Sequence, residues 1–231
     1  MNQTIIPVWI NDQETLWLTQ AAIESLNKAG SKQNIIIDNG STYGAGSLLE
    51  LGECLRNNTN LGYAKAVNQG LELAGKIVAI ANNDIIVSPN CFEIALDILK
   101  DKQVGSVHFR MLPYSQDFSY GNETWIEGKE RWCTSSFFIV RNVQRYDENF
   151  LNSYDDYDFW YRMRHSGLRT AYTNKACYRH LDSHTQKKIP HRSINDNNNR
   201  EYYKEKYGEY PHEQFARMYP DQVKQEWRPF P

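Results

Sequence analysis

The sequence lacks long hydrophobic runs. None of its apolar stretches approaches the roughly 18 uninterrupted apolar residues that cross a bilayer as a helix. The first residues, Met1-Asn2-Gln3-Thr4, also lack the basic and apolar regions of a secretory signal. These absences predict a protein without a transmembrane segment and with a cytoplasmic location.

Cysteine is scarce, and its spacing excludes two classes of site. The four cysteines, at positions 54, 91, 133 and 177, lie far apart and form no CxxC pair. This pattern argues against a structural zinc site and against a disulfide framework. We therefore expect reduced, buried thiols.

Net charge is small as well, because 26 Lys and Arg oppose 28 Asp and Glu and leave a formal charge of -2. The field of the whole molecule thus gives no reason to expect a nucleic-acid partner. The distribution is uneven, since residues 160–206 hold eleven basic side chains and four acidic ones. That stretch is suited to lie beside phosphates, whether those of a donor, a lipid or DNA.

Hydrophobic periodicity predicts alternating strands and helices in a chain long enough for one sizeable core. We expect strands over 5–10, 34–38, 77–81, 104–109, 137–140 and 169–172, and helices over 14–29, 63–73, 91–99 and 157–166. This order predicts a single α/β, Rossmann-like domain whose central sheet is mostly parallel.

Two polar segments interrupt the pattern. Residues 111–130 predict a long loop of the kind that forms lids or acceptor sites. Residues 195–199 predict a polar break before two tail helices. We expect a catalytic domain over 1–184 and a helical extension over 185–231 packed on it.

Polar residues follow two predicted strands at the edge where ligands of parallel sheets gather. Asp38, followed by Asn39-Gly40-Ser41, is suited to accept hydrogen bonds from a nucleotide base or ribose, and equally suited to form an Asx turn. In Asn82-Asn83-Asp84, the carboxylate can hold Mg²⁺ or Mn²⁺ across a diphosphate. Taken alone, this triplet favours an ordinary turn.

Two further clusters contain titratable groups. Asp155, Asp156 and Asp158 repel one another, which suits a general base facing an acceptor hydroxyl. The alternative is a helix N-terminus with a variant capping box, although a cap explains one or two acids rather than three. His180 or His184 offers a neutral imidazole to a metal or a diphosphate, although lone histidines are more often structural.

Five motifs occur in an order that resembles the family 2 glycosyltransferases of GT-A fold, in particular their rhamnosyltransferase-like branch. The resemblance spans residues 4–184 and is most specific over 60–70. The motifs are Ile6-Pro7-Val8-Trp9-Ile10-Asn11, Ile37-Asp38-Asn39-Gly40-Ser41, Asn60-x-Gly62-Tyr63-Ala64-x-Ala66-x-Asn68-x-Gly70, Asn82-Asn83-Asp84, and Asp155-Asp156-Tyr157-Asp158 with Arg162.

The resemblance implies positions for the donor and the metal ion. The nucleotide base would lie near Pro7, Val8 and Asp38, while a loop and helix facing the donor would be shaped by Asn60, Gly62 and Asn68. The triplet Asn82-Asn83-Asp84 takes the place of the family's DxD-type element, with Asp84 as the acid that binds Mn²⁺ or Mg²⁺. Two asparagines leave fewer charged ligands, which makes His180 an expected additional ligand.

The resemblance also implies an inverting reaction. Asp156 corresponds to the catalytic base, and Asp155 stands in the place of the family's glutamate. Asp158 and Arg162 would orient the helix and its neighbours. Residues 132–136 would lie on the acceptor side. Residues 200–208 are similar to an ending found in some of these enzymes, which either packs on the domain or shapes an acceptor groove.

We therefore expect a metal-dependent glycosyltransferase that takes a UDP-, GDP- or dTDP-linked sugar and acts on a glycan or lipid-linked glycan. One alternative is a transferase that modifies hydroxylated nucleobases in DNA, and another is an inactive module that binds sugar nucleotides. A nucleotidyltransferase ranks last, because no glycine- and arginine-rich phosphate loop follows Val8. The oligomeric state stays open.

Overall fold

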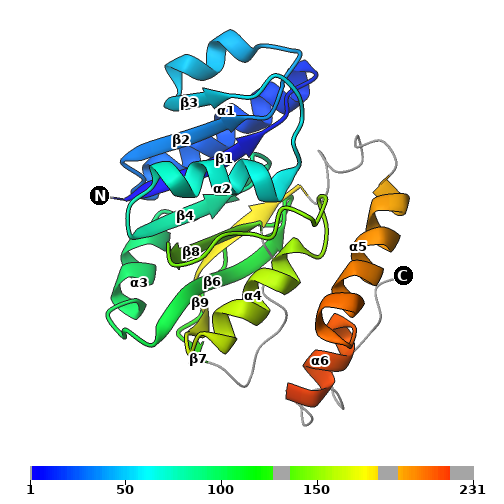
Figure 1. Cartoon of the computed structure of the whole chain (residues 1–231). Coiled ribbons are helices and arrows are strands. Elements are labelled where there is room, and N and C mark those ends of the chain that lie inside the picture. Colours follow the sequence, from blue (N-terminus) through cyan, green and yellow to red (C-terminus); the bar gives the residue numbers. More distant parts are fainter. Residues whose placement is uncertain (1, 127–135, 182–191, 219–231) are drawn as a thin grey trace.

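The computed structural model of the chain describes residues 2–126, 136–181 and 192–218 (Figure 1). In chain order the elements are β1 (Gln3–Val8), α1 (Gln13–Lys28), β2 (Gln33–Asp38), the 3-10 helix η1 (Ala45–Glu50), β3 (Glu53–Arg56), α2 (Tyr63–Leu73), β4 (Ile77–Ala81), β5 (Ile85–Val87), α3 (Cys91–Ile98), β6 (Val104–Pro113), β7 (Thr124–Ile126), β8 (Phe137–Arg141), α4 (Asp155–His165), β9 (Arg169–His180), α5 (Arg192–Tyr207) and α6 (Pro211–Met218).

Within these residues nine strands form one sheet in the order β3-β2-β1-β4-β8-β6-β9-β5, with β7 paired to β9. Strand β1 is parallel to β2 and β4, β2 is parallel to β3, and β6 is parallel to β9. Strand β8 lies antiparallel between β4 and β6, while β5 and β7 run antiparallel to β9. All strands except β5, β7 and β8 therefore share one direction, which confirms the predicted α/β fold with a mostly parallel central sheet.

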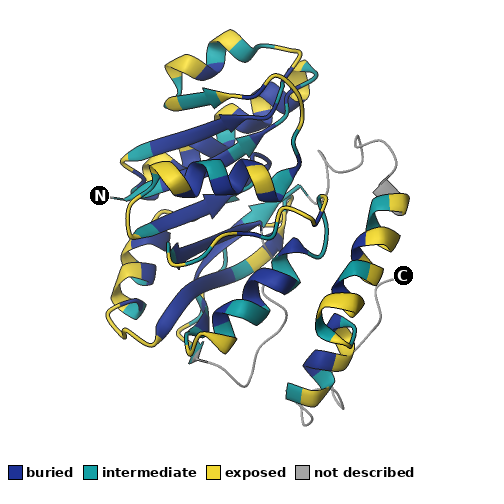
Figure 2. Cartoon of the chain, viewed as in Figure 1, coloured by how far each residue is buried: buried dark blue, intermediate teal, exposed yellow. Residues whose placement is uncertain are grey.

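Two apolar cores cover opposite faces of the sheet because successive strand residues point to opposite sides. In β1, Ile6 packs with the α1 and α3 side chains Leu26 and Phe92. Its neighbour Ile5 packs with α2 and α4, through Val67 and Trp160. Figure 2 shows these central strands in the buried colour.

Local chemistry fixes the positions of the first two helices. Helix α1 begins after Asp12, whose carboxylate accepts a hydrogen bond from the Thr15 backbone N–H at 2.8 Å. Helix α2 crosses β1 closely at Gly70, where an added Cβ would lie 2.4 Å from Cγ2 of Ile5. Glycine at this position therefore permits the close approach of helix and strand.

Some predicted boundaries were wrong. Residues 195–199, predicted as a polar break, lie inside α5. The predicted loop over 111–130 contains the end of β6 and the strand β7, with residues 127–130 outside the described part. The predicted strand 169–172 continues to His180. In each case, contacts with distant parts of the chain stabilise structure in a locally polar segment.

The described cysteines are free thiols: Cys91 and Cys177 are buried and Cys54 is partly buried. Cys133 lies outside the described residues. Burial raises the pKa of Cys91 to about 12. None of the described helices combines the length and apolar composition needed to cross a bilayer.

Candidate active site

The carboxyl ends of β1 and β2 bring the predicted base-binding residues together. Val8 lies directly opposite Asp38 in the parallel register, and Pro7 lies opposite Ile37. Val8 and Asp38 are buried, whereas Pro7 is partly exposed. The predicted residues therefore line one short stretch of the sheet edge.

Asp38 forms two sets of contacts. Its Oδ1 accepts a hydrogen bond from the Ser41 backbone N–H at 2.9 Å, which is the contact of an Asx turn. Its Oδ2 pairs with the Arg56 guanidinium, whose second arm donates to the Ser41 carbonyl at 2.8 Å. Asp38 is 1% exposed, whereas Arg56 is 50% exposed. The guanidinium thus compensates the buried carboxylate and presents positive charge at the edge.

Sequence analysis missed Arg56 because it missed the four-residue strand β3. In the sheet, Arg56 is the register partner of Asp38. The apolar Cys54 and Leu55 before Arg56 were the available signal, although so short a segment carries little periodicity. The pairing with β2 places the arginine beside the carboxylate.

The loop before α2 is built from side-chain amides. Asn39 donates to Asn60 Oδ1 at 2.8 Å and to the Gly62 carbonyl at 3.1 Å. Asn60 Oδ1 also accepts from the Gly62 backbone N–H at 2.9 Å. Gly62 has φ +89°, a conformation that favours glycine, and it immediately precedes α2. Asn60 and Gly62 therefore shape this loop.

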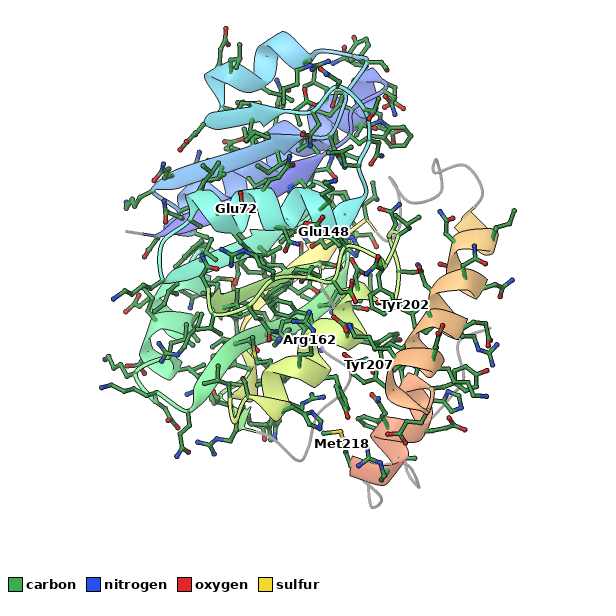
Figure 3. The ribbon with its side chains drawn as sticks, in the orientation of Figure 1. Glu72, Glu148, Arg162, Tyr202, Tyr207 and Met218 are labelled. Carbon is green, nitrogen blue, oxygen red and sulfur yellow. The ribbon has the colours of Figure 1, made fainter. Side chains whose placement is uncertain are left out.

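Asn68 has a different position from the other predicted donor residues. It is buried within α2, and its amide donates to the Tyr146 carbonyl at 3.0 Å and to Glu148 Oε1 at 2.9 Å. Its Oδ1 accepts from the Tyr146 backbone N–H at 2.8 Å. Asn68 thus ties α2 to the segment before α4, near the Glu148 label in Figure 3.

The two predicted metal ligands are in contact. His180, the last residue of β9, places Nε2 3.1 Å from Oδ1 of Asp84, which follows β4. The other ring nitrogen lies 3.4 Å from the Ser136 hydroxyl. Both side chains are almost fully buried. Residues 96 positions apart thus meet at one end of the sheet.

The two asparagines of the triplet point in different directions. Asn83 is buried and donates to Thr19 Oγ1 of α1 at 2.9 Å. Asn82 is partly exposed, and its backbone N–H donates to the Ser136 carbonyl at 2.8 Å. Asn83 therefore anchors the turn, while the Asn82 side chain stays accessible at the edge.

The carboxylate of Asp84 and the imidazole of His180 are suitable ligands for a divalent cation such as Mn²⁺. Among the described residues, no set of three His, Cys, Asp or Glu side chains is grouped to hold an ion. The pair therefore fits an open site in which a substrate contributes further oxygens. His184 and residues 132–135 lie outside the described part of the chain.

The predicted base and its neighbour occupy the first turn of α4. Asp155 is 5% exposed, and its Oδ2 is buried without a hydrogen-bond partner in the structure described. Asp156 Oδ1 accepts from the Tyr157 backbone N–H at 2.8 Å. Tyr154 precedes the helix in a left-handed conformation, and it makes no side-chain cap hydrogen bond, so the alternative of a variant capping box is not borne out within the described residues.

Burial raises the pKa values of both carboxyls above their usual range, and the Asp156 charge raises that of Asp155 further. Burial, followed by the charges of Asp155, Asp156 and Asp84, also raises the pKa of Tyr63 at the start of α2. Three acids from two predicted motifs therefore act on one tyrosine.

Asp158 joins α4 to α5. It is fully buried and accepts from Arg162 at 2.6 and 2.9 Å, from Lys206 at 2.6 Å and from the Tyr207 hydroxyl at 2.6 Å. Figure 3 labels Arg162 and Tyr207 on the facing sides of the two helices. Asp158 and Arg162 thus orient α4 against its neighbour.

The basic stretch 160–206 is distributed over α4, β9 and α5. Six of its eleven cations pair with acids or lie over rings: Arg162 with Asp158, Arg169 with Asp101, Lys206 with Asp147, Arg179 over Phe118, and Arg200 and Lys204 over Tyr210. These contacts weaken the expectation of one surface that binds phosphates.

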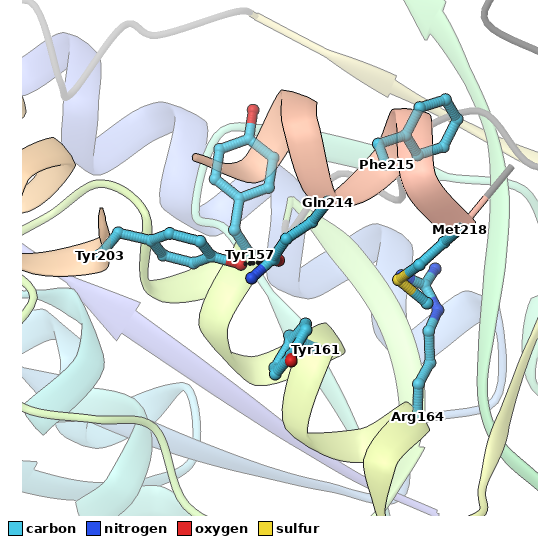
Figure 4. Close-up of a pocket in the computed structure, with 7 residues that line it drawn as sticks. All are labelled: Tyr157, Tyr161, Arg164, Tyr203, Gln214, Phe215 and Met218. Carbon is cyan, nitrogen blue, oxygen red and sulfur yellow. Dashed lines mark hydrogen bonds between the residues drawn. The ribbon is translucent and has the colours of Figure 1, made fainter. Parts of the chain in front are cut away.

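A crevice between α4, α5 and α6 is lined by Tyr157, Tyr161, Arg164, Tyr203, Gln214, Phe215 and Met218 (Figure 4). Inside it, the Tyr203 hydroxyl donates to Gln214. The space holds no more than about one water molecule, so it is a gap in helix packing rather than the donor site.

Comparison with known proteins provides an independent test of these expectations. The sequence model described as "Glycosyl transferase family 2" matches residues 5–193, which is most of the chain. No curated protein matches the sequence.

Several solved structures share the fold. TarS from S. aureus is 16% identical, with a TM-score of 0.62, over 79% of this chain and 37% of that one. The mannosyltransferase PcManGT from Pyrobaculum calidifontis, in complex with GDP-Man and Mn²⁺, is 15% identical, with a TM-score of 0.61, over 78% and 56%. GalNAc-T7 with UDP, GalNAc and Mn²⁺ is 13% identical, with a TM-score of 0.61, over 78% and 43%. The chain thus spans only part of each neighbour.

Proposed function

The chain belongs to glycosyl transferase family 2, and from this premise we propose that it moves a sugar from a nucleoside-diphosphate donor to an acceptor hydroxyl with inversion. The observation that supports the proposal most strongly is the contact between Asp84 and His180, together with the paired carboxyls Asp155 and Asp156 in the first turn of α4. A pair of catalytic carboxyls and a pair of metal ligands are what such a transfer needs.

The donor would lie along the carboxyl edge of the sheet. We assign its base to Pro7, Val8 and Asp38, with Arg56 holding the Asp38 carboxylate in place. Asn60, Gly62, Asn82 and Asn83 shape the walls, and Asn68 supports α2 from behind. Two structural neighbours carry UDP or GDP-Man together with Mn²⁺, which supports a donor of this class.

Asp84 and His180 would hold Mn²⁺ or Mg²⁺, and the bound cation supplies counter-charge to the diphosphate that leaves. The buried position of both side chains keeps them pre-arranged and excludes most competing water. Asn83 supports Asp84 by fixing the preceding turn to α1.

Asp156 would act as the base. Its carboxylate removes the proton of the acceptor hydroxyl, and the acceptor oxygen forms a bond to the anomeric carbon. The bond between that carbon and the diphosphate oxygen breaks, and the electron pair leaves with the nucleoside diphosphate. Burial raises the pKa of Asp156 and so increases its basicity.

A glycan or lipid-linked glycan is our proposed acceptor class. The nucleobase alternative is weaker, because six cations of the basic stretch pair with acids or lie over rings. The inactive-module alternative is also weaker, since Asp155 and Asp156 are both present at the head of α4.

The test is a panel of UDP-, GDP- and dTDP-sugars, assayed for donor hydrolysis and thermal stabilisation with and without Mn²⁺. We expect one donor to give metal-dependent turnover. Asp156→Asn should abolish that turnover and keep donor binding. Binding without turnover in the wild type would instead support the inactive module, and unchanged turnover in the variant would remove Asp156 from the role of base.

A further inference from the structure

Loop 150–154, which leads into α4, has an unusual backbone. Asn152 and Tyr154 both lie in the left-handed region, with φ of 60° and 63°. This region is uncommon for residues other than glycine, and especially for a bulky side chain such as tyrosine. Such conformations persist only where the surroundings impose them, and they cluster at functional sites.

A single side chain of α5 makes four hydrogen bonds to this loop. Asn199 of α5 accepts from the Leu151 backbone N–H at 3.2 Å and donates to the Leu151 carbonyl at 3.0 Å. It also donates to the Ser153 carbonyl at 3.1 Å and to the Ser153 hydroxyl at 2.8 Å. Asn199 is 4% exposed, so its amide is committed to the loop. We call this set of bonds the Asn199 clasp.

The opposite side of the loop is held by α2. Asn152 Oδ1 accepts from the backbone N–H of Tyr63, the first residue of that helix, at 2.9 Å. Its neighbour Leu151 lies against the loop before α2, because its Cδ2 would be 3.7 Å from a Cβ placed on Gly62. The loop is thus fixed between the donor side of the site and α5.

The other end of α5 is anchored independently of the loop. Lys206 and Tyr207 both bind Asp158 of α4 at 2.6 Å. Figure 1 shows α5 beside α4 along this length. Because α5 is fixed to α4 at one end and to the loop at the other, it sets where the first turn of α4 begins.

We propose that Asn199 is a positioning residue for glycosyl transfer, holding loop 150–154 so that Asp155 and Asp156 face the acceptor. The inference rests on the proposed function. A displacement of about 1 Å at a reacting group can lower a rate by roughly a hundredfold. The residues assigned to the donor base, Pro7, Val8 and Asp38, lie on β1 and β2, whereas Asn199 bonds Leu151 and Ser153, so loss of the clasp should affect turnover more than donor affinity.

The same helix offers a matched control. Asn198 is adjacent to Asn199 in α5 but exposed, so Asn198→Ala removes the same chemical group from a surface position. Asn199→Ala removes the clasp. Asn199→Asp keeps the side-chain volume but places a carboxylate oxygen against the carbonyls of Leu151 and Ser153. It therefore separates loss of the hydrogen bonds from loss of side-chain volume in Asn199→Ala.

The experiment measures kcat for donor hydrolysis, donor Kd with Mn²⁺, and hydrogen exchange of the amides of 150–158 in these variants. We expect Asn199→Ala and Asn199→Asp to lower kcat by roughly tenfold or more. Donor Kd should stay within about twofold of wild type, loop exchange should accelerate, and Asn198→Ala should behave as wild type.

Equal kcat in the Asn199 and Asn198 variants would overturn the proposal, as would a donor Kd that weakens in parallel with kcat. The two proposals fail differently. A wild-type protein that turns over no donor contradicts the proposed function and the catalytic role of the clasp together. An active wild type with unaffected Asn199 variants contradicts the clasp alone.

Discussion

At the scale of single residues, four aspartates have different electrostatic environments, with Asp38, Asp155 and Asp158 buried and Asp156 partly exposed. Asp38 pairs with Arg56, and Asp158 pairs with Arg162 and Lys206, so their charges are compensated. Asp155 has no such partner among the described residues, and Asp156 accepts a backbone N–H from its own helix. A buried carboxylate without a cation favours its protonated form. Burial accordingly raises the pKa values of Asp155 and Asp156.

The sequence predicted part of this difference. Repulsion among three nearby acids predicted a raised proton affinity for at least one of them, and the pKa values of Asp155 and Asp156 are raised, with burial as the largest cause. Lys206 and Tyr207, 48 and 49 positions away, donate to Asp158. Partners so distant leave no local signal in the sequence.

We predict that Asp156→Asn raises thermal stability at pH 7.5 while abolishing turnover. Because the folded-state pKa of Asp156 is raised, its ionised form destabilises the folded protein above that pKa. Each unit of pKa shift corresponds to about 1.4 kcal/mol. The penalty shrinks as pH falls toward the ordinary aspartate pKa of about 4 and disappears about one unit below it, where the carboxyl is protonated in both states, so the gain in Tm should shrink as pH falls.

The measurement is Tm of wild type and variant from pH 4 to 8, with Asp117→Asn as a control on an exposed acid. The control should show no such pH dependence. If the Tm difference is constant across this range, the Asp156 carboxyl does not titrate above its ordinary range.

At the scale of elements, the sequence predicted long buried strands and missed short ones. Strands β2 and β4 are buried on both faces and therefore consist of continuous apolar runs, which can be recognised in the sequence. Strands β3, β5 and β7 contain three or four residues each and owe their conformation to pairing with neighbours. Likewise, the asparagine-rich segment of α5 is helical although its composition suggests a break.

The crossing of α2 over β1 leads to a prediction at this scale. Alanine at position 70 would improve helix propensity by about 1 kcal/mol, but its Cβ would lie 2.4 Å from Ile5. Overpacking typically costs about 1–3 kcal/mol. Since a contact this short forces a shift of helix or strand, we expect Gly70→Ala to lower the free energy of unfolding, measured by urea denaturation.

Two further variants separate the clash from the change in helix propensity. A Cβ added at Gly46 in η1 would have no described atom beyond its chain neighbours within 4 Å, so Gly46→Ala should leave the free energy of unfolding nearly unchanged. Ile5→Ala removes the Cγ1 and Cγ2 atoms that the added Cβ would meet, so this second substitution should cost less in Gly70→Ala than it does in the wild type. A double variant that is simply additive would show that Ile5 is not the group in conflict.

At the scale of the whole molecule, the residues expected to bind the donor and its metal ion come from strands in different parts of the sheet. The residues assigned to its base end β1 and β2, whereas Asp84 follows β4 and His180 ends β9. The overall α/β fold followed from the order of apolar segments, but the contact between Asp84 and His180 did not. It depends on the short strand β5, which begins directly after Asp84 and pairs with β9 so that Ile85 lies opposite His180.

We predict from this arrangement that metal and nucleotide bind cooperatively. Asp84 and His180 offer two side-chain ligands, so Mn²⁺ alone should bind weakly, while the donor diphosphate completes the coordination. A ligand at a hundred times its Kd stabilises a protein by about 2.7 kcal/mol. The Tm shift with Mn²⁺ and nucleotide together should therefore exceed the sum of the separate shifts.

Asp84→Asn should remove the excess, and His165→Gln, on an exposed histidine, should preserve it. Additive shifts in the wild type would contradict a shared site, and chelation of the metal should return the nucleotide shift to its metal-free value.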